Sequence, residues 1–253
     1  MGIVYRARDM TQNQPVAIKV FRTKGLRKEK KLENFLRAAK LTLVLSHPNL
    51  IKGIEVSNRR RIYYLVMELA TKGNLATLIE ERGKIESLEE VFNIVRQIVK
   101  GLDYIHRRGI IHRDIKPSNI LLFEDNVVKI SDFDLFYPSG KKETYRFRPK
   151  GTPQYMAPEQ IRGENLTPAS DIYSLGVTIY EMLAGRPPYR GSTVEEVMIR
   201  HLNFKPMDVR AYSPFLPMDI GVAVMKCLEK EPSQRYSSVR EFWEAFSGKS
   251  ELS

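Results

Sequence analysis

The chain has 253 residues, of which 42% are hydrophobic and 28% are charged, so it holds enough apolar material for one large core or two joined lobes and is not a disordered chain. Its one cysteine, Cys227, excludes an internal disulfide, and the sequence shows neither a bilayer-spanning apolar run nor a signal-peptide pattern, so we expect a soluble, cytoplasmic protein. The net charge of +11 raises nucleic-acid binding, but basic runs at residues 28–31 and 59–61 lack interleaved aromatic side chains, which favours a solvated basic surface and no nucleic-acid partner.

The first part of the chain alternates in the manner of β-strands and is interrupted by one basic helical stretch. The turn-rich segment TQNQ, residues 11–14, joins the first two strands. The strands are expected at residues 2–9, 15–22, 53–57 and 61–68, and the helix at residues 28–45.

Beyond the break KGN at residues 72–74 the chain becomes helical. Ser87 and Glu90 have the spacing of a capping box, and apolar residues then recur at three- and four-residue spacing until Gly109 ends the helix. Further helices are expected at residues 169–184, 194–202, 220–228 and 239–246. Strands followed by helices predict an α+β fold, in which a small β-rich lobe packs on a larger α-helical lobe with a ligand cleft between them.

The strongest chemical signal is the octapeptide HRDIKPSN at residues 112–119, directly after the long helix. It supplies a carboxylate, a lysine and an amide, which are groups that phosphoryl transfer requires. It resembles the catalytic loop H-R-D-x-x-x-x-N of eukaryotic-type protein kinases. The resemblance implies that Asp114 is the base that orients the substrate hydroxyl, that Lys116 steadies the transferred phosphate, and that Asn119 binds a magnesium ion. A lysine at position 116 is typical of serine/threonine kinases.

Further motifs follow in the order of the same family: VAIK at residues 16–19, SDFD at residues 131–134 and APE at residues 157–159. The resemblance implies that Lys19 holds the α- and β-phosphates of ATP. It also implies that Asp132 chelates Mg²⁺ between the phosphates. The segment from Asp132 to the APE motif is then an activation segment.

The resemblance also assigns scaffold roles in the helical part. Thr152 is expected to contact Asp114 and Lys116. Asp171 is expected to brace the backbone of the catalytic loop, and Arg235 is expected to pair with Glu159. Asp171 and Arg235 hold the scaffold and do not react, whereas Thr152 belongs to a stretch, residues 151–156, that resembles the substrate-docking segment of serine/threonine kinases.

An ATP cleft is implied in the same way. Met67 falls at the gatekeeper position, and the backbone of the hinge that follows it is expected to hydrogen-bond adenine. Each of these residues is otherwise an ordinary core type, so burial alone also explains it. The implied nucleotide-binding residues are Gly2, Val4, Ala17, Lys19, Met67, Glu68, Ala70 and Leu121.

The sequence departs from the family at the glycine-rich loop G-x-G-x-x-G-x-V, of which only Gly2-Ile3-Val4 is present. The first strand and two glycines are missing, and those glycines let backbone N–H groups approach the phosphates. The chain is therefore expected to be truncated within this loop. A shortened gene model, a fragment of a longer protein and a true loss are all consistent with the sequence.

Two further departures concern the lysine of VAIK. Counting back from HPN at residues 47–49, the helix position that carries its glutamate partner in the family holds Ala38. Glu33 lies five residues earlier, about 140° around the helix, and is a poor substitute. The D-F-G glycine is replaced by Asp134, whose carboxylate could bind the metal or repel the phosphates. Ala38→Glu is expected to raise activity unless Lys19 has a different partner.

The resulting prediction is a protein-kinase-like bilobal domain over residues 1–253, with an N-lobe at 1–69 and the hinge and C-lobe at 70–253. Its expected function is transfer of the γ-phosphoryl group of Mg-ATP to serine or threonine hydroxyls of protein substrates. The alternative is a pseudokinase that binds nucleotide or acts as a scaffold. A nucleic-acid-binding module would rest on net charge alone.

Regulation and substrate choice also follow from the resemblance. Thr144, and next to it Tyr145, are candidate phosphorylation sites whose phosphate would pair with Arg113. Kinases directed by upstream arginine carry acids at the positions that Ser118 and Asn74 occupy here. We therefore expect no strong demand for arginine upstream of the target residue.

Overall fold

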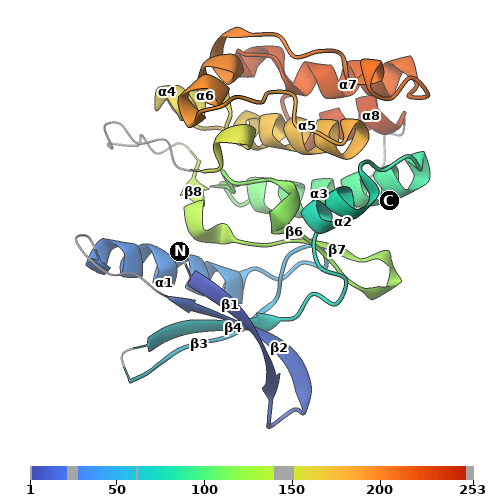
Figure 1. Cartoon of the computed structure of the whole chain (residues 1–253). Coiled ribbons are helices and arrows are strands. Elements are labelled where there is room, and N and C mark those ends of the chain that lie inside the picture. Colours follow the sequence, from blue (N-terminus) through green and yellow to red (C-terminus); the bar gives the residue numbers. More distant parts are fainter. Residues whose placement is uncertain (1, 22–27, 61, 140–150, 249–253) are drawn as a thin grey trace.

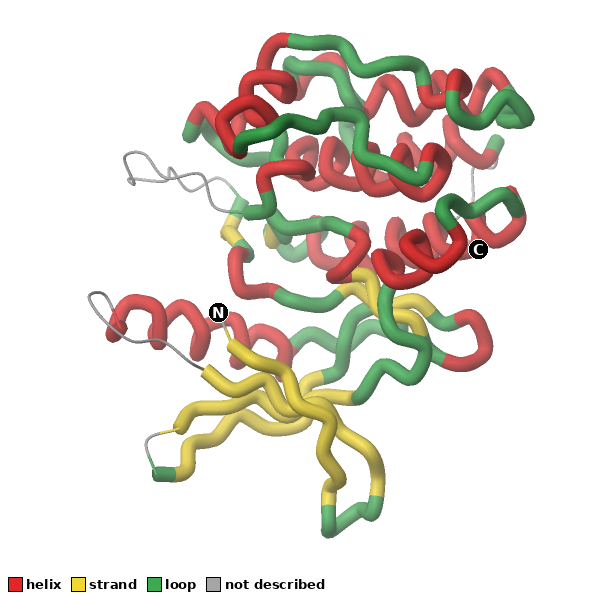
Figure 2. The backbone as a smooth tube through the Cα atoms, viewed as in Figure 1, coloured by secondary structure: helices red, strands yellow, loops and turns green. Residues whose placement is uncertain are grey.

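The computed structural model describes residues 2–21, 28–60, 62–139 and 151–248 of the chain (Figure 1). A small antiparallel sheet with one helix beside it lies at one end, and a larger body of helices lies at the other (Figure 2). This arrangement confirms the expected α+β fold with a β-rich lobe and a helical lobe. Thr144 and Tyr145 lie outside the described residues.

The sheet of the smaller lobe has the strand order β1-β2-β4-β3, with neighbouring strands antiparallel. Asp9 shapes the first turn, because its carboxylate accepts hydrogen bonds from the backbone of Thr11 and Gln12 at 2.8 and 3.2 Å. The elements of this lobe are β1 (Gly2–Asp9), β2 (Gln14–Phe21), α1 (Lys28–Val44), β3 (Gly53–Arg59) and β4 (Ile62–Glu68).

The larger lobe contains the remaining helices and two pairs of short strands. Its α-helices are α2 (Leu75–Arg82), α3 (Leu88–His106), α4 (Pro158–Arg162), α5 (Pro168–Ala184), α6 (Val194–Asn203), α7 (Met218–Cys227) and α8 (Val239–Ser247). Its strands are β5 (Ile110–Ile111), β6 (Ile120–Leu122), β7 (Val128–Ile130) and β8 (Tyr137–Pro138), which pair as β5-β8 and β6-β7. Its 3₁₀ turns are η1 (Pro117–Asn119), η2 (Glu124–Asn126), η3 (Phe133–Leu135), η4 (Pro153–Tyr155), η5 (Val209–Ala211) and η6 (Pro232–Gln234).

Helix α3 forms where the periodic pattern predicts it. The Ser87 hydroxyl accepts a hydrogen bond from the backbone N–H of Glu90 at 3.3 Å and so caps the helix. The Glu90 carboxylate accepts hydrogen bonds from Arg82 at 3.0 Å, so only the Ser87 half of the expected capping box is present. Gly109 adopts a φ of 66° in the turn that follows the helix, as the sequence predicts.

Helix α5 is the centre of the helical lobe, because nearly its whole circumference is buried. It packs against α7 and α3, and α3 packs in turn against α8. Gly176 lets α5 approach α7 closely, since a Cβ atom there would collide with the side chain of Cys227. The single cysteine is therefore a fully buried packing residue.

Two helices were not anticipated from the sequence. Helix α2 begins after Asn74, whose side chain accepts a hydrogen bond from the N–H of Thr77 at 3.1 Å. Helix α4 has only five residues and begins within the APE motif. Within the described part of the chain, no helix combines the length and the apolar character needed to cross a membrane.

Candidate active site between the sheet and the helices

A cavity with a volume of about 290 Å³ lies between the sheet of the smaller lobe and the loops of the larger lobe. Strand pairing builds the wall on the side of the sheet, because Ala17 on β2 lies opposite Met67 on β4, and Val4 on β1 lies opposite Lys19 on β2. The apolar lining predicted from the sequence is present: Val4, Ala17, Met67 and Leu121. The hinge contributes Glu68 and Ala70, and the polar lining includes Lys19, Asn119 and Asp132.

Gly2, the remaining predicted nucleotide-binding residue, does not belong to this lining. It lies at the start of β1 opposite Phe21. A Cβ atom at position 2 would collide with the backbone carbonyl of Val20 on β2. Strand packing therefore suffices to explain the glycine.

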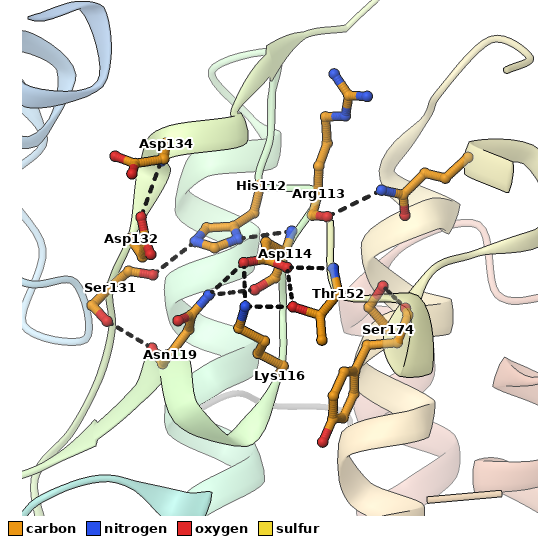
Figure 3. A network of polar contacts seen from close by, with 12 residues as sticks. His112, Arg113, Asp114, Lys116, Asn119, Ser131, Asp132, Asp134, Thr152 and Ser174 are labelled. Atoms are coloured by element: carbon orange, nitrogen blue, oxygen red, sulfur yellow. Dashed lines mark hydrogen bonds and ion pairs between the residues drawn. The ribbon is translucent and has the colours of Figure 1, made fainter. Parts of the chain in front are cut away.

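Asp114 lies at the centre of a polar network (Figure 3), and it is bonded to Asn119, which lines the cavity. Its Oδ2 atom is 2.7 Å from Lys116 Nζ, and its Oδ1 atom accepts hydrogen bonds from the hydroxyl and the backbone N–H of Thr152, both at 3.2 Å. Lys116 Nζ also donates to the Thr152 hydroxyl at 2.5 Å. The expected contacts of Thr152 with Asp114 and Lys116 are thus confirmed, and they join the end of the activation segment to the loop.

Asn119 connects this network to the cavity. Its Nδ2 atom donates to the Asp114 backbone carbonyl at 2.8 Å and to the Asp114 carboxylate at 3.0 Å. Its own backbone carbonyl accepts from the Ser131 hydroxyl at 3.0 Å and from the Ser131 N–H at 2.9 Å. The loop that carries Asp114 and the strand end that carries Asp132 are therefore held in register, because Ser131 and Asp132 are neighbours.

The backbone of the catalytic loop rests on a buried carboxylate. Asp171, at the first turn of α5, accepts hydrogen bonds from the N–H groups of His112 and Arg113 at 2.9 and 2.8 Å, and the His106 ring lies 2.7 Å away. Burial opposes ionisation of this fully buried group, but the hydrogen bond and charge of His106 hold the pKa of Asp171 below its usual value. The predicted bracing role of Asp171 is confirmed.

The contacts of His112 assign its tautomer. Its Nδ1 atom accepts a hydrogen bond from the Asp114 N–H at 3.3 Å, and its Nε2 atom lies 3.1 Å from the Ser131 carbonyl. A carbonyl can only accept, so the neutral ring carries its proton on Nε2. His112 therefore ties the Asp114 loop to the strand end before Asp132, and it packs edge-on against Phe133 with ring centroids 5.0 Å apart.

A second buried ion pair fixes the far end of the activation segment. Both oxygens of Glu159 accept hydrogen bonds from Arg235, at 2.8 and 2.9 Å, and both side chains are essentially inaccessible to solvent. Arg235 also donates to the Ala169 carbonyl at the start of α5. The predicted Arg235–Glu159 pair is confirmed, and its two-pronged geometry favours arginine over lysine.

Lys19 makes two ion pairs at the inner end of the cavity. Its Nζ atom is 2.9 Å from Asp132 Oδ1 and 2.7 Å from Asp134 Oδ2. Burial opposes the charge of Lys19, but the two carboxylates raise its pKa above the usual value. Burial likewise opposes ionisation of Asp132, but the Lys19 ammonium holds the pKa of Asp132 below its usual value. Burial, and next the neighbouring Asp132, raise the pKa of Asp134.

The helix position assigned to Ala38 faces the same region. Ala38 is buried, with 3% of its surface exposed, and it lines the cavity together with Lys19 and Asp134. Glu33, five residues earlier, is exposed on the helix. The register read from the sequence therefore places alanine, and not glutamate, toward the lysine.

Sequence reasoning missed the partner that Lys19 does have. Asp134 was noticed only as an addition near a metal, whereas its carboxylate pairs with Lys19. The backbone at position 134 does not need glycine, because the φ of Asp134 is not positive. The residue of this turn with a left-handed backbone is Asp132, whose φ is 68°. The sequence did hold a signal for this pairing, because two departures from the family pattern coincide: position 38 lacks the usual acidic residue, and position 134 carries an additional one.

Comparison with known proteins agrees with the geometry. The sequence model of the family described as "Protein kinase domain" matches residues 1–245. The chain is 31% identical over 247 residues to a probable serine/threonine-protein kinase of Clostridium acetobutylicum, with 97% of this chain and 37% of that protein covered.

Two further relatives are the serine/threonine-protein kinases PrkC of Bacillus subtilis and PknB of Mycobacterium tuberculosis. Each is 32% identical over 95% of this chain, and the matched regions cover 37% and 40% of those proteins. The chain thus spans well under half the length of these relatives. Since the family pattern extends over nearly all of its sequence, with Lys19 and Asp132 lining the cavity and Asp114 bonded to the lining residue Asn119, the chain belongs to the protein kinase domain family.

Proposed function

We propose that this chain is the catalytic domain of an ATP-dependent serine/threonine protein kinase, with an N-lobe at residues 1–69 and the hinge and C-lobe at residues 70–253. The observation that supports it most is the convergence of Asp114, Lys116 and Thr152 beside the cavity that Lys19 and Asp132 line. The relatives that are named serine/threonine kinases agree with it. Protein substrates and a cytoplasmic location are part of the same proposal.

In the proposed reaction a serine or threonine hydroxyl of a protein substrate attacks the γ-phosphorus of ATP. The new oxygen–phosphorus bond forms, the bond from the γ-phosphorus to the bridging oxygen of ADP breaks, and the hydroxyl proton passes to the carboxylate of Asp114. Lys116 supplies positive charge beside the transferred group, and Lys19 orients the α- and β-phosphates. The protein contributes mainly position and charge, because the Asp114 network is already assembled.

The adenine ring is proposed to lie between the apolar side chains of Val4 and Ala17 on one face and Leu121 on the other. The backbone of Glu68 and Ala70 would hydrogen-bond its polar edge. The Glu68 side chain is turned away to other partners, since it accepts from Lys52 N–H and from Lys129, both at 2.7 Å. Met67 lines the same cavity.

Magnesium is the metal that the donor set fits. Asp132 offers a carboxylate at the cavity, and Asn119 donates through its amide nitrogen to Asp114, which leaves the amide oxygen for a cation. Mg²⁺ is usually held by one or two carboxylates together with phosphate oxygens, and these two side chains could take that part. When bound, the ion would neutralise phosphate charge.

The alternative is a pseudokinase that binds nucleotide without turnover. Ala38 favours it, because the usual lysine partner is absent from α1. The intact network around Asp114 and the ion pair of Lys19 with Asp132 favour turnover. We therefore retain the kinase as the proposed function.

The test is phosphoryl transfer by the full-length parent protein. Incubation with γ-labelled ATP, magnesium and a general protein substrate should label serine and threonine but not tyrosine, as phosphoamino-acid analysis would report. Lys19→Met serves as the inactive control. Absence of labelled protein, in a sample whose melting temperature rises with Mg-ATP, would instead assign a pseudokinase.

A further inference from the structure

The ammonium group of Lys19 lies between two carboxylates that leave the chain from one short turn. Asp132 Oδ1 is 2.9 Å away and Asp134 Oδ2 is 2.7 Å away. Only 11% of the Lys19 side chain and 24% of the Asp134 side chain are exposed, so the Lys19–Asp134 contact is largely shielded from water. Such partly buried pairs hold a lysine more firmly than pairs at the surface do.

A lysine that orients phosphates needs an anion that keeps its flexible chain in place when Asp132 is engaged with a cation. Helix α1 does not provide that anion, because the residues that it contributes to the cavity lining are not acidic and Glu33 is exposed; they are Phe35, Ala38, Ala39 and Thr42.

Turn η3 is positioned to provide it. It packs against α1, and the Arg37 guanidinium of α1 lies 5.1 Å from the ring centroid of Phe136, directly after the turn. The start of the turn is fixed by Asp132, whose side chain accepts from the N–H of Asp134 at 3.4 Å. Asp134 therefore lies at the same cavity as Ala38 and Lys19.

We propose that Asp134 is the positioning residue for Lys19, and that the acidic partner of the lysine has moved from helix α1 to turn η3, with Ala38 as the matching loss. This inference rests on the proposed function, in which Lys19 orients the phosphates of ATP. Asp132 is then available to hold a cation, while Asp134 keeps Lys19 in place. Asp134 acts through Lys19 and does not touch the reacting atoms.

The test is a mutant cycle in the full-length parent protein, built from Asp134→Gly, Ala38→Glu and the two combined. Asp134→Gly should weaken the binding of ATP and raise KM for ATP about tenfold, which is the loss of roughly 1.4 kcal/mol of interaction. Ala38→Glu alone should bring no gain, because Lys19 is already paired and the added carboxylate would lie near Asp134, which carries the same charge. The double variant should recover ATP affinity to within about threefold of the parent, since the pair is rebuilt from α1.

Two controls separate charge from shape and from the alternative acid. Asp134→Asn keeps the size of the side chain and removes its charge, so it should also weaken ATP binding about tenfold. It therefore tests the role of the charge even if the glycine variant folds poorly. Glu33→Gln, on the exposed face of the same helix, should leave ATP affinity unchanged. In a Lys19→Met background, Asp134→Asn should cause no further loss of ATP affinity, because its effect passes through the lysine.

The metal dependence decides between a lysine partner and a metal ligand. ATP affinity measured in EDTA should fall in Asp134→Asn as it does with magnesium present. A loss seen only with magnesium, or additive effects of Asp134→Gly and Ala38→Glu without recovery in the double variant, would overturn the proposal. The binding measurements do not require turnover, so they report on the Lys19–Asp134 pair even if the parent transfers no phosphate. A lack of phosphoryl transfer by the parent would count against the proposed function alone.

Discussion

The hydroxyl and the backbone N–H of Thr152 both lie 3.2 Å from the same oxygen, Oδ1 of Asp114. The hydroxyl is also 2.5 Å from Lys116 Nζ, so Thr152 bridges the two polar groups that flank the proposed position of the substrate hydroxyl. A residue close to the APE motif is thereby bonded to the proposed base, and the activation segment is coupled to the catalytic loop through one side chain.

Removal of this bridge should lower turnover. Thr152→Val keeps the shape and the backbone contact but deletes the hydroxyl, and kcat should fall by about ten- to a hundredfold with little change in KM for ATP. Thr152→Ser keeps the hydroxyl and should retain most activity. Steady-state kinetics of both variants measures the difference, and equal activity of the serine and valine variants would show that the hydroxyl has no role.

The buried carboxylate of Asp171 should contribute a pH-dependent part of the stability. Asp171→Asn removes a charged acceptor from two backbone N–H groups and should lower the free energy of unfolding at pH 7 by about 2–3 kcal/mol. Because the folded-state pKa of Asp171 is lowered, its stabilisation is fully present above the unfolded-state pKa of about 4 and is lost as pH falls through the folded-state pKa.

Denaturant unfolding of the parent and of Asp171→Asn at several pH values measures this contribution. The difference between the two proteins should be constant from pH 7 down to about pH 5 and should shrink below about pH 4. A difference that grew on acidification would contradict the assignment of Asp171 as an ionised brace.

Substrate choice should not depend on arginine upstream of the target residue. Ser118 lines the cavity and Asn74 caps helix α2, and neither carries a charge that would attract a guanidinium group. A peptide array with the active parent protein should show no dominant upstream arginine. Asn74→Asp, which preserves the cap, together with Ser118→Glu should introduce that preference, whereas Asn203→Asp on the surface of α6 should not. A strong arginine preference of the parent would contradict this account.

The sequence predicts the long elements and the local motifs well, because both depend on residues near one another in the chain. The apolar period and the Ser87 cap place helix α3 within one residue of its observed start, and strand β1 has the predicted bounds. Helix α2 was missed because eight residues carry too little periodicity to be distinguished from a loop, and only its Asn74 cap signals it. Short helix α4 was missed for the same reason.

The site was predictable where a motif keeps its residues together and less so where distant segments meet. The HRDIKPSN segment and its contact with Thr152 follow from the pattern, and so does the Arg235–Glu159 pair. The pairing of Lys19 with Asp134 could not be predicted in this way, because the two residues are distant in sequence. Asp132, at the start of the same turn, is already 113 residues from Lys19. Counting back from HPN placed Ala38 at the position of the usual lysine partner, but only the folded chain shows which carboxylate pairs with Lys19 instead.

The most direct measurement compares the parent protein with Asp114→Asn in one sample series, recording both the melting temperature with Mg-ATP and the rate of phosphoryl transfer to protein. Asp114 is 6% exposed and its carboxylate is held by Lys116, Asn119 and Thr152, so the isosteric amide should fold and still bind nucleotide. We predict an unchanged thermal shift with Mg-ATP and a rate lowered by at least about a hundredfold. A variant that transferred phosphate at near-parental rate would contradict the assignment of Asp114 as the base.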